Sequence, residues 1–362
     1  MANFKNVGVL TGGGDCPGLN AVIRSVTRAC FSHGIRVWGI KNGFGGLVEN
    51  DIGELADRDI SGILPRGGTI LGTTNRDNPF NYAVPHDGGY VYKDMSQQAL
   101  ANLKTRGIEA LVVIGGDGSL RIAHEFSLLG LPVVSVPKTI DNDIPMTERT
   151  FGFDTAVACA SEALDRLHTT AESHHRVMLL EVMGRYAGWI AFHSGMAGGA
   201  DVILIPEVPY KIEAVVAAIK ARRAQGKLFS LVVVAEGAFP VGGEMTVARI
   251  VENSAEKVRL GGVGEKLARQ LEDLTGFESR CTVLGYLQRG GSPTAYDRIL
   301  STRYGVAAVD ALVAGNTGVM VALQKNGIVT VPIRDIAGQP SNVPLEALHV
   351  GRSIGICFGD EA

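Results

Sequence analysis

Short apolar segments alternate with amphipathic segments along most of the 362-residue chain, and this alternation limits the folds that the chain can adopt. Apolar segments of strand length occur at residues 7–10, 36–40, 110–114, 133–136, 177–182, 202–205 and 228–235. Segments with helical spacing at residues 20–30, 96–106, 155–171 and 212–225 lie between them. Strands that alternate with helices predict an α/β protein with mostly parallel, doubly wound sheets, and there are enough strands for two such sheets.

Charge and hydropathy exclude several classes of function. The chain has 34 Lys and Arg against 37 Asp and Glu, so its net charge of −3 favours neither nucleic acid nor an anionic membrane as a partner. No apolar stretch approaches the roughly 18 residues of a membrane helix, and the N-terminus lacks a secretory signal. Five widely spaced cysteines form no C-x-x-C pair, which argues against a transition-metal site. We therefore predict a cytoplasmic protein that takes small-molecule substrates.

Glycines are concentrated in the segments that follow two of the predicted strands. Thr11–Asn20 carries Gly12, Gly13 and Gly14 and leads into a helix whose amino end could face an anion, although tight packing would explain these glycines equally well. Asp117 lies in the second glycine segment, residues 114–120. A carboxylate there could meet a polyphosphate only through a cation such as Mg²⁺; the alternative is that Asp117 caps the next helix.

Two carboxylates follow a third buried strand, in the segment of residues 137–144. Asp141 and Asp143 are costly to bury without partners, so a loop at the carboxyl end of the strand is expected. One of them could take a proton from a hydroxyl nucleophile while the other acts near a metal ion or orients its neighbour. A surface turn rich in Asp and Asn would explain the same composition.

These segments, together with three later ones, resemble the 6-phosphofructokinase family of the ATP-dependent type. The matching segments occupy residues 10–20, 115–119, 137–143, 181–185, 287–293 and 296–298, in the order in which the family has them. The resemblance implies two Rossmann-like domains with the active site in the cleft between them. It also implies a nucleotide-binding domain of residues 1–150 plus about 290–338, and a sugar-phosphate-binding domain of about 151–289 plus 339–362.

The resemblance implies phosphoryl transfer from ATP to the 1-hydroxyl of fructose 6-phosphate, with Mg²⁺. Asp141 would be the catalytic base, and Asp143, Thr139 and Arg76 would act beside it on the transferring group. Asp117 would bind the metal, and the nucleotide phosphates would contact Gly14, Gly116, Gly118 and Ser119. The predicted substrate-binding residues are Thr139, Ile140, Asp141, Arg176, Met183, Gly184, Arg185, Glu236, Arg280, Tyr286, Leu287, Gln288 and Arg289.

Three arginines would hold the phosphate of the sugar in this family pattern. Forked guanidinium donors suit a dianionic phosphate, and a chain of net charge −3 must gather them locally. Arg176 and Arg280 would reach the site from a neighbouring subunit, which implies a homodimer or homotetramer with shared active sites. Arg289 would act in its own subunit.

The phosphoryl donor depends on two positions. Pyrophosphate users of the family tend to carry Asp at the position of Gly118, where its carboxylate would repel the α-phosphate of a nucleotide. Lys138, in contrast, occurs in pyrophosphate users where the familiar ATP enzymes have Gly. We rank ATP first because Gly118 lacks the carboxylate that would repel the α-phosphate, and Lys138 does not restore that repulsion. A pyrophosphate-dependent phosphotransferase remains the alternative.

Two other classes of protein fit the sequence less well. A catalytically silent nucleotide sensor would be expected to have lost a carboxylate from the third loop, yet Asp141 and Asp143 are both present. A kinase that acts on dinucleotides or lipids would not need the sugar-phosphate motif at residues 181–185. The segment 239–253 resembles an insertion relative to short bacterial members, and its role is not predicted.

Overall fold

The computed structural model describes residues 4–87, 89–250, 258–336 and 340–360, without the side chains of residues 250 and 259. The chain divides into two compact units, each assembled from separate stretches of sequence. Unit 1 comprises Met1–Thr139, Ile144–Gly152 and Arg289–Gln339, and unit 2 comprises Ile140–Asp143, Phe153–Gln288 and Pro340–Ala362.

The division differs from the predicted domain scheme at the third loop. Residues 140–143 were expected in the first domain, but they group with unit 2. The Ser341 N–H, in the last stretch of unit 2, donates a hydrogen bond of 2.8 Å to the Asp143 carbonyl and joins the two segments within this unit. The predicted boundary at residue 339 lies outside the described residues.

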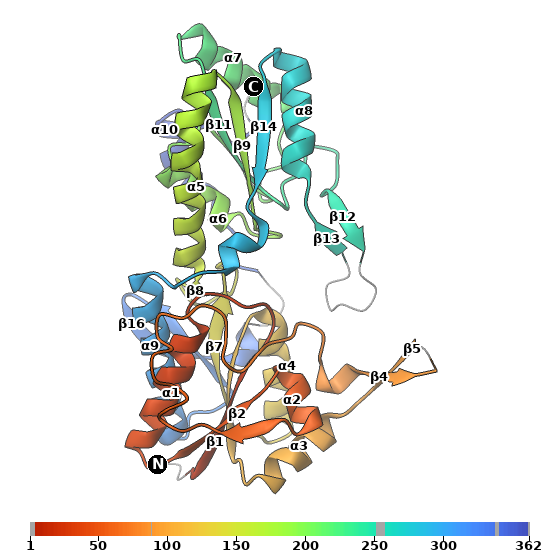
Figure 1. The fold of residues 1–362 in the computed structure, drawn as a ribbon, viewed down its shortest axis with the longest axis vertical. Coiled ribbons are helices and arrows are strands. Elements are labelled where there is room, and N and C mark those ends of the chain that lie inside the picture. The colour runs from red at the N-terminus through yellow and green to blue at the C-terminus, as the bar shows by residue number, and fades with distance from the viewer. Residues whose placement is uncertain (1–3, 88, 251–257, 337–339, 361–362) are drawn as a thin grey trace. The chain divides into compact units, whose positions relative to one another are not determined.

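Unit 1 is built on an eight-stranded, mainly parallel sheet (Figure 1). The strand order is β16-β15-β7-β6-β1-β2-β3, and β8 pairs with β7 beside this path. The edge pairs β15–β16 and β2–β3 are antiparallel, and the other pairs are parallel. The strands are β1 (Asn6–Thr11), β2 (Arg36–Ile40), β3 (Ile52–Glu54), β6 (Ala110–Gly115), β7 (Val133–Thr139), β8 (Phe151–Gly152), β15 (Val319–Gln324) and β16 (Gly327–Pro332).

Helices cover both faces of this sheet, which is why its central strands are apolar on both sides. One face carries α1 (Leu19–Ser32) and α9 (Ala295–Ala314), and the other carries α2 (Phe44–Glu49), α3 (Ser96–Thr105) and α4 (Asp117–Leu128). On the second face the ring centroid of Phe126 lies 5.0 Å from that of Phe80 and 6.2 Å from that of Phe44. Short 3₁₀ turns occur at Pro79–Asn81 and Ile333–Asp335.

Unit 2 contains a parallel four-stranded sheet of order β10-β11-β9-β14. Its strands are β9 (Val177–Val182), β10 (Val202–Leu204), β11 (Ser230–Ala235) and β14 (Ser279–Val283). The helices α5 (Phe153–His174) and α6 (Trp189–Ala197) lie on one face, and α7 (Ile212–Ala224) and α8 (Val263–Thr275) lie on the other (Figure 1). A 3₁₀ turn at Gly285–Arg289 follows β14, and another at Leu345–Ala347 precedes α10 (Leu348–Ser353). The predicted α/β class with mostly parallel sheets is confirmed.

The C-terminal stretch of unit 2 is held by a few polar contacts. Glu207, after β10, accepts hydrogen bonds of 2.9 Å from the N–H groups of Gly188 and Val343. Trp189 Nε1 donates a bond of 2.7 Å to the carbonyl of Ser341. Burial raises the pKa of Glu207, and these backbone donors act in the opposite direction. The last stretch of the chain is therefore an integral part of unit 2.

Two hairpins were not predicted from the sequence. The strands β4 (Tyr82–His86) and β5 (Gly89–Lys93) form an antiparallel pair that projects from unit 1 (Figure 1), and β5 is exposed throughout. The strands β12 (Val247–Ile250) and β13 (Val258–Leu260) pair in unit 2. The described residues between the glycine segments 237–243 and 261–264 contain these two strands and no helix. Residues 251–257 lie outside the described part.

Within the described ranges, no helix combines the length and the apolar character that a bilayer span requires.

The helices α1 and α9 approach closely at Gly305. A Cβ at this position would lie 2.0 Å from Ser25 Oγ and 2.9 Å from the carbonyl oxygen of Val22. Ser25 is itself buried, and its hydroxyl donates a bond of 3.0 Å to Val22. Since backbone atoms line the contact, a side chain at residue 305 would have to push the helices apart.

We predict that Gly305→Ala lowers the free energy of unfolding by about 1–3 kcal/mol, because it overpacks this helix contact. Gly118→Ala, at the start of α4, is the matched control, since no atom lies within 4 Å of the added Cβ. Its stability should not fall, because Ala is the better helix former. Urea unfolding of both variants measures the difference, and equal stabilities would contradict the packing argument.

Candidate active site

The three predicted loops begin at one edge of the sheet in unit 1. β1, β6 and β7 are neighbours and pair in parallel, with Thr11 beside Ile114 and Ile114 beside Val136. The chain continues from β1 to β2 on one side of β1, whereas β6 lies on its other side. Open α/β sheets bind ligands where the strand order reverses in this way, beyond the carboxyl ends of the strands.

Ser119 lies where the first two loops meet. It is buried, and a Cβ at Gly12 would lie 2.5 Å from its hydroxyl oxygen. A Cβ at Gly115 would lie 2.2 Å from the Ser119 Cβ, so both loops need glycine at these positions. The Gly12 N–H donates a bond of 2.9 Å to the Ile114 carbonyl, which joins the same loops through the backbone. Ser119 therefore packs the loops together, and its predicted contact with a phosphate stays a prediction.

Two basic side chains reach the first glycine loop within unit 1. Lys138, near the end of β7, is 4% exposed, and its Nζ lies 3.3 Å from the position of a Cβ on Gly13. Arg289 Nη1 lies 2.1 Å from the position of a Cβ on Gly14. Arg289 thus contacts the glycine loop, and it belongs to unit 1 rather than to the unit of Arg176 and Arg280. Both cations concentrate positive charge beside a loop with no side chain in the way.

The helix α4 starts directly after β6, with Gly116 as its N-cap residue. Gly116 occupies the N-cap position, so the alternative that Asp117 caps the helix is wrong; Asp117 lies in the first turn, where its Oδ2 lies 2.8 Å from Arg121 Nη2. The first turn of a helix leaves backbone N–H groups without helical partners, and these attract anions. No atom lies within 4 Å of a Cβ built on Gly118, so space is open beside this turn.

Asp117 is the predicted metal ligand, and its environment fits a magnesium ion carried by a substrate. Its side chain is 47% exposed at the start of α4. The described residues contain no group of three or more His, Cys, Asp or Glu placed to hold a metal together. Mg²⁺ commonly binds one or two carboxylates and completes its shell with substrate phosphates and water, so a single exposed carboxylate suits it.

Arg76 lies on a segment that is bonded to the glycine loop. Thr73 Oγ1 donates to the carbonyl oxygens of Thr11 and Gly13 at 3.0 and 2.7 Å. The Gly13 N–H donates a bond of 3.0 Å to the Thr74 carbonyl. Arg76 follows two residues later and is exposed. Arg76 was predicted from the sequence, but Thr73 was not, because nothing in the sequence distinguishes it from an ordinary loop threonine.

The third loop is where the chain passes from unit 1 to unit 2. Thr139 ends β7 in unit 1, and Ile140 to Asp143 belong to unit 2. Thr150 Oγ1 donates a bond of 2.7 Å to the Thr139 carbonyl and fixes the end of the strand. Asn142 is buried and has a left-handed φ of 53°, which supports the predicted turn. Asp141 and Asp143 flank it and are both partly exposed.

Asp297 is a buried carboxylate that the sequence reasoning did not select. It is 0% exposed and accepts a bond of 3.0 Å from the Gly152 N–H. Gly152 pairs with Thr139, so Asp297 holds the strand beside the third loop. The charges of Lys138 and Asp297 both act on the buried thiol of Cys16, whose pKa is raised mainly by burial. The Tyr-Asp-Arg motif at residues 296–298 was the available signal, but it did not show which group the carboxylate would meet.

The predicted sugar-binding residues of unit 2 follow three neighbouring parallel strands. Met183, Gly184 and Arg185 follow β9, Glu236 follows β11, and Tyr286 to Gln288 lie in the turn after β14. The Gly237 N–H donates a bond of 3.0 Å to the Gly184 carbonyl, which joins the first two loops. Gln288 is fully buried, whereas Tyr286 and Leu287 are 71% and 68% exposed. Gln288 is thus placed to support the turn, and its two neighbours are accessible.

Glu181, the first residue of the sugar-phosphate motif, is buried and bonded to backbone N–H groups. It is 2% exposed, and its carboxylate accepts bonds from the N–H groups of Gly262 and Gly264 at 3.2 and 2.8 Å. These groups open α8, so a negative charge at this end of the helix is favourable. Glu181 therefore links β9 to the start of α8, two residues before Met183.

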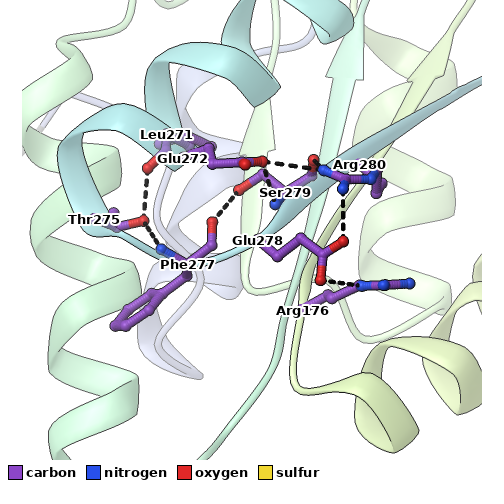
Figure 2. A network of polar contacts seen from close by, with 8 residues as sticks. All are labelled: Arg176, Leu271, Glu272, Thr275, Phe277, Glu278, Ser279 and Arg280. Carbon is purple, nitrogen blue, oxygen red and sulfur yellow. Dashed lines mark hydrogen bonds and ion pairs between the residues drawn. The ribbon is translucent and has the colours of Figure 1, made fainter.

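Arg176 and Arg280 lie at the opposite end of the sheet in unit 2 from Met183 and Arg185. Arg176 precedes β9 and Arg280 is near the start of β14, so the length of β9, about 20 Å, separates the two ends. Figure 2 shows both guanidinium groups around Glu278. Arg176 Nε lies 2.8 Å from Oε2 of Glu278, and Arg280 Nη2 lies 2.5 Å from Oε1. The hydrogen bond from Arg176 is the main cause that lowers the pKa of Glu278.

The family model and the similar relatives point to one family. A phosphofructokinase family model matches residues 6–312. The chain is 54% identical, over 99% of its length and 100% of the relative, to ATP-dependent 6-phosphofructokinase 2 of Clostridium perfringens. It is 50% identical to a pyrophosphate–fructose 6-phosphate 1-phosphotransferase of Amycolatopsis mediterranei, over 94% of the chain and 96% of the relative.

A solved structure agrees with these sequence matches. Phosphofructokinase of Pichia pastoris in the T-state superposes with a TM-score of 0.80 at 32% identity, covering 93% of this chain and 36% of that one. The fold, the order of the motifs and the full-length similarity therefore lead to one conclusion: the chain belongs to the phosphofructokinase family.

Proposed function

We propose that the chain transfers the terminal phosphoryl group of ATP to the 1-hydroxyl of fructose 6-phosphate, giving fructose 1,6-bisphosphate and ADP. The observation that carries the choice of donor is the open space beside Gly118 at the first turn of α4. A nucleotide needs room for its α-phosphate there, whereas pyrophosphate does not. The predicted cytoplasmic location is part of the same proposal.

The donor half of the site is assigned to unit 1. Gly14, Gly116 and Gly118 expose backbone beside the donor phosphates, and the first turn of α4 supplies N–H groups. Lys138 adds a positive charge at the glycine loop. Asp117 would hold Mg²⁺, which would supply positive charge to the donor phosphates.

Asp141 is proposed as the base that accepts the proton of the 1-hydroxyl as the oxygen attacks. Thr139 is two residues away along the chain, so covalent connectivity alone keeps it near the base. Asp143 and Arg76 would act beside them, and the guanidinium of Arg76 would stabilise charge on the transferring group. In-line transfer requires donor and acceptor to be held together, and orientation of this kind supplies much of the rate.

The acceptor half of the site is assigned to unit 2. Met183, Gly184, Arg185 and Glu236 would hold the sugar, with Ile140 and the turn of Tyr286 to Gln288 beside it. Arg289 is proposed to reach the sugar phosphate from unit 1. Arg176 and Arg280 are separated from Arg185 by the length of a strand, which is longer than a hexose phosphate. The proposal therefore needs these two arginines to come from a second copy of the chain, and it includes a homo-oligomer, as a dimer or a tetramer.

The first experiment compares the two donors directly. Turnover of fructose 6-phosphate with Mg²⁺ and either ATP or pyrophosphate is measured on the same preparation. Activity with ATP supports the proposal, and activity with pyrophosphate alone would replace it by the alternative donor. Silence with both donors would remove the enzymatic assignment.

Asp141→Asn should lower kcat by about 10²–10⁴-fold, because the amide cannot accept the proton of the 1-hydroxyl. The Kd for fructose 6-phosphate, measured by calorimetry, should change little, since the substitution conserves size. A variant with unaltered turnover would refute the role of base, and so would a variant whose only defect is weak sugar binding.

Gly118→Asp should weaken the use of ATP by at least about tenfold and leave pyrophosphate favoured, because the new carboxylate would face the α-phosphate. The open space at this position lets the side chain enter without displacing neighbours. Gly118→Asn is the control of equal size without the charge, so the loss of ATP use in Gly118→Asp beyond that in Gly118→Asn measures the repulsion. The ratio of kcat/KM for the two donors is the measurement, and an unchanged ratio would contradict the donor argument.

Mixing two inactive variants tests the shared site. Arg280→Ala and Asp141→Asn are each expected to be inactive alone, but an oligomer that contains both has one site in which both residues are intact. Co-refolding at equal amounts should restore about a quarter of the parent activity for statistically paired subunits. In the control for refolding, Arg166→Ala takes the place of Arg280→Ala, because it removes only an exposed ion pair with Glu162. Absence of recovery while the oligomer forms would show that the arginines act elsewhere.

A further inference from the structure

Arg121 is a basic residue in the donor half of unit 1 to which no role has been given so far. It lies one turn into α4, four residues after Asp117 and three after Gly118. Side chains three and four residues apart share one face of a helix. Asp117, Gly118 and Arg121 are all exposed, whereas Ser119 and Leu120 are buried against the sheet. The exposed face of the first turn therefore combines a carboxylate, a position without a side chain and a guanidinium.

The guanidinium is drawn toward the amino end of the helix. Arg121 Nη2 lies 2.8 Å from Asp117 Oδ2, and Nε lies 3.3 Å from Oδ1. At 100° per residue, Arg121 projects at an angle between those of Asp117 and Gly118. Its side chain is 54% exposed, so the guanidinium can turn toward a ligand without unpacking the core.

The position of this charge adds little to the stability of the helix. A cation near the amino end opposes the helix dipole, and an exposed ion pair with Asp117 contributes little to stability. A guanidinium beside an open space at a helix start is, in contrast, well suited to a phosphate, because its forked donors match two phosphate oxygens.

We infer that Arg121 is a donor-binding residue that contacts the α-phosphate of the nucleotide over Gly118. This inference rests on the proposed use of ATP. Gly118 leaves the space for the α-phosphate, and Arg121 supplies the positive charge that holds it there. Arg121 thereby favours a nucleotide over pyrophosphate, which has no phosphate to place in that position.

Binding of ADP to Arg121→Ala tests the inference without catalysis. Calorimetry is carried out in EDTA, so that metal bound by Asp117 does not enter the result. The Kd for ADP should rise by about tenfold, the loss expected for a hydrogen bond between charged groups, and the Kd for fructose 6-phosphate should not change. Arg166→Ala, which breaks an exposed ion pair of the same i, i+4 spacing on α5, should leave both values unchanged.

A second background separates contact with the ligand from neutralisation of Asp117. If Arg121 only offsets the charge of Asp117, its removal will have no effect in an Asp117→Asn protein. A direct contact predicts that Asp117→Asn with Arg121→Ala still binds ADP about tenfold more weakly than Asp117→Asn alone. Loss of the difference would overturn the inference, as would an unchanged Kd in the single variant. If the parent protein binds no ADP and uses only pyrophosphate, the proposed donor is wrong as well.

Discussion

Parallel pairing of β1, β6 and β7 is the constraint on which the donor half of the molecule depends. Parallel strands in register end at one edge of the sheet, so the loops that follow them must lie together. The loops are far apart in sequence, at residues 12–18, 115–116 and 140–143. The same constraint acts in unit 2, where β11, β9 and β14 end beside one another and carry the residues assigned to the sugar. Each half of the proposed reaction thus begins from the ends of a parallel sheet.

Buried polar groups then fix the details of these edges. Asp297 accepts the Gly152 N–H behind the third loop, and Glu181 accepts two N–H groups at the start of α8. A buried carboxylate without partners would be costly, whereas one bonded to backbone N–H groups holds two segments at a defined distance. These residues belong to the family motifs without needing to touch a substrate. A motif residue can therefore be a support for its neighbours rather than a ligand.

The two candidate donors, ATP and pyrophosphate, differ in the phosphate groups that the site would have to bind. Two relatives are 54% and 50% identical to the chain; the name of the first specifies ATP and that of the second specifies pyrophosphate. Lys138 lies beside the glycine loop, and Gly118 faces open space. The proposed function assigns this space to the α-phosphate of a nucleotide, a group that pyrophosphate lacks. Under that proposal Gly118, rather than Lys138, discriminates between the donors.

The sequence by itself determined the α/β class, the strands that carry the loops and most of the residues assigned to the site. Apolar strand segments and glycine-rich turns are local patterns, so strands such as residues 36–40 and 177–182 were predicted with their observed bounds. The tertiary structure decided which distant groups meet. Thr73 with Gly13, Asp297 with Gly152 and Arg121 beside the space at Gly118 depend on strand order or helix geometry around the site. It also placed Arg176 and Arg280 at the opposite end of their sheet from Arg185, because the two ends of a strand such as β9 lie about 20 Å apart.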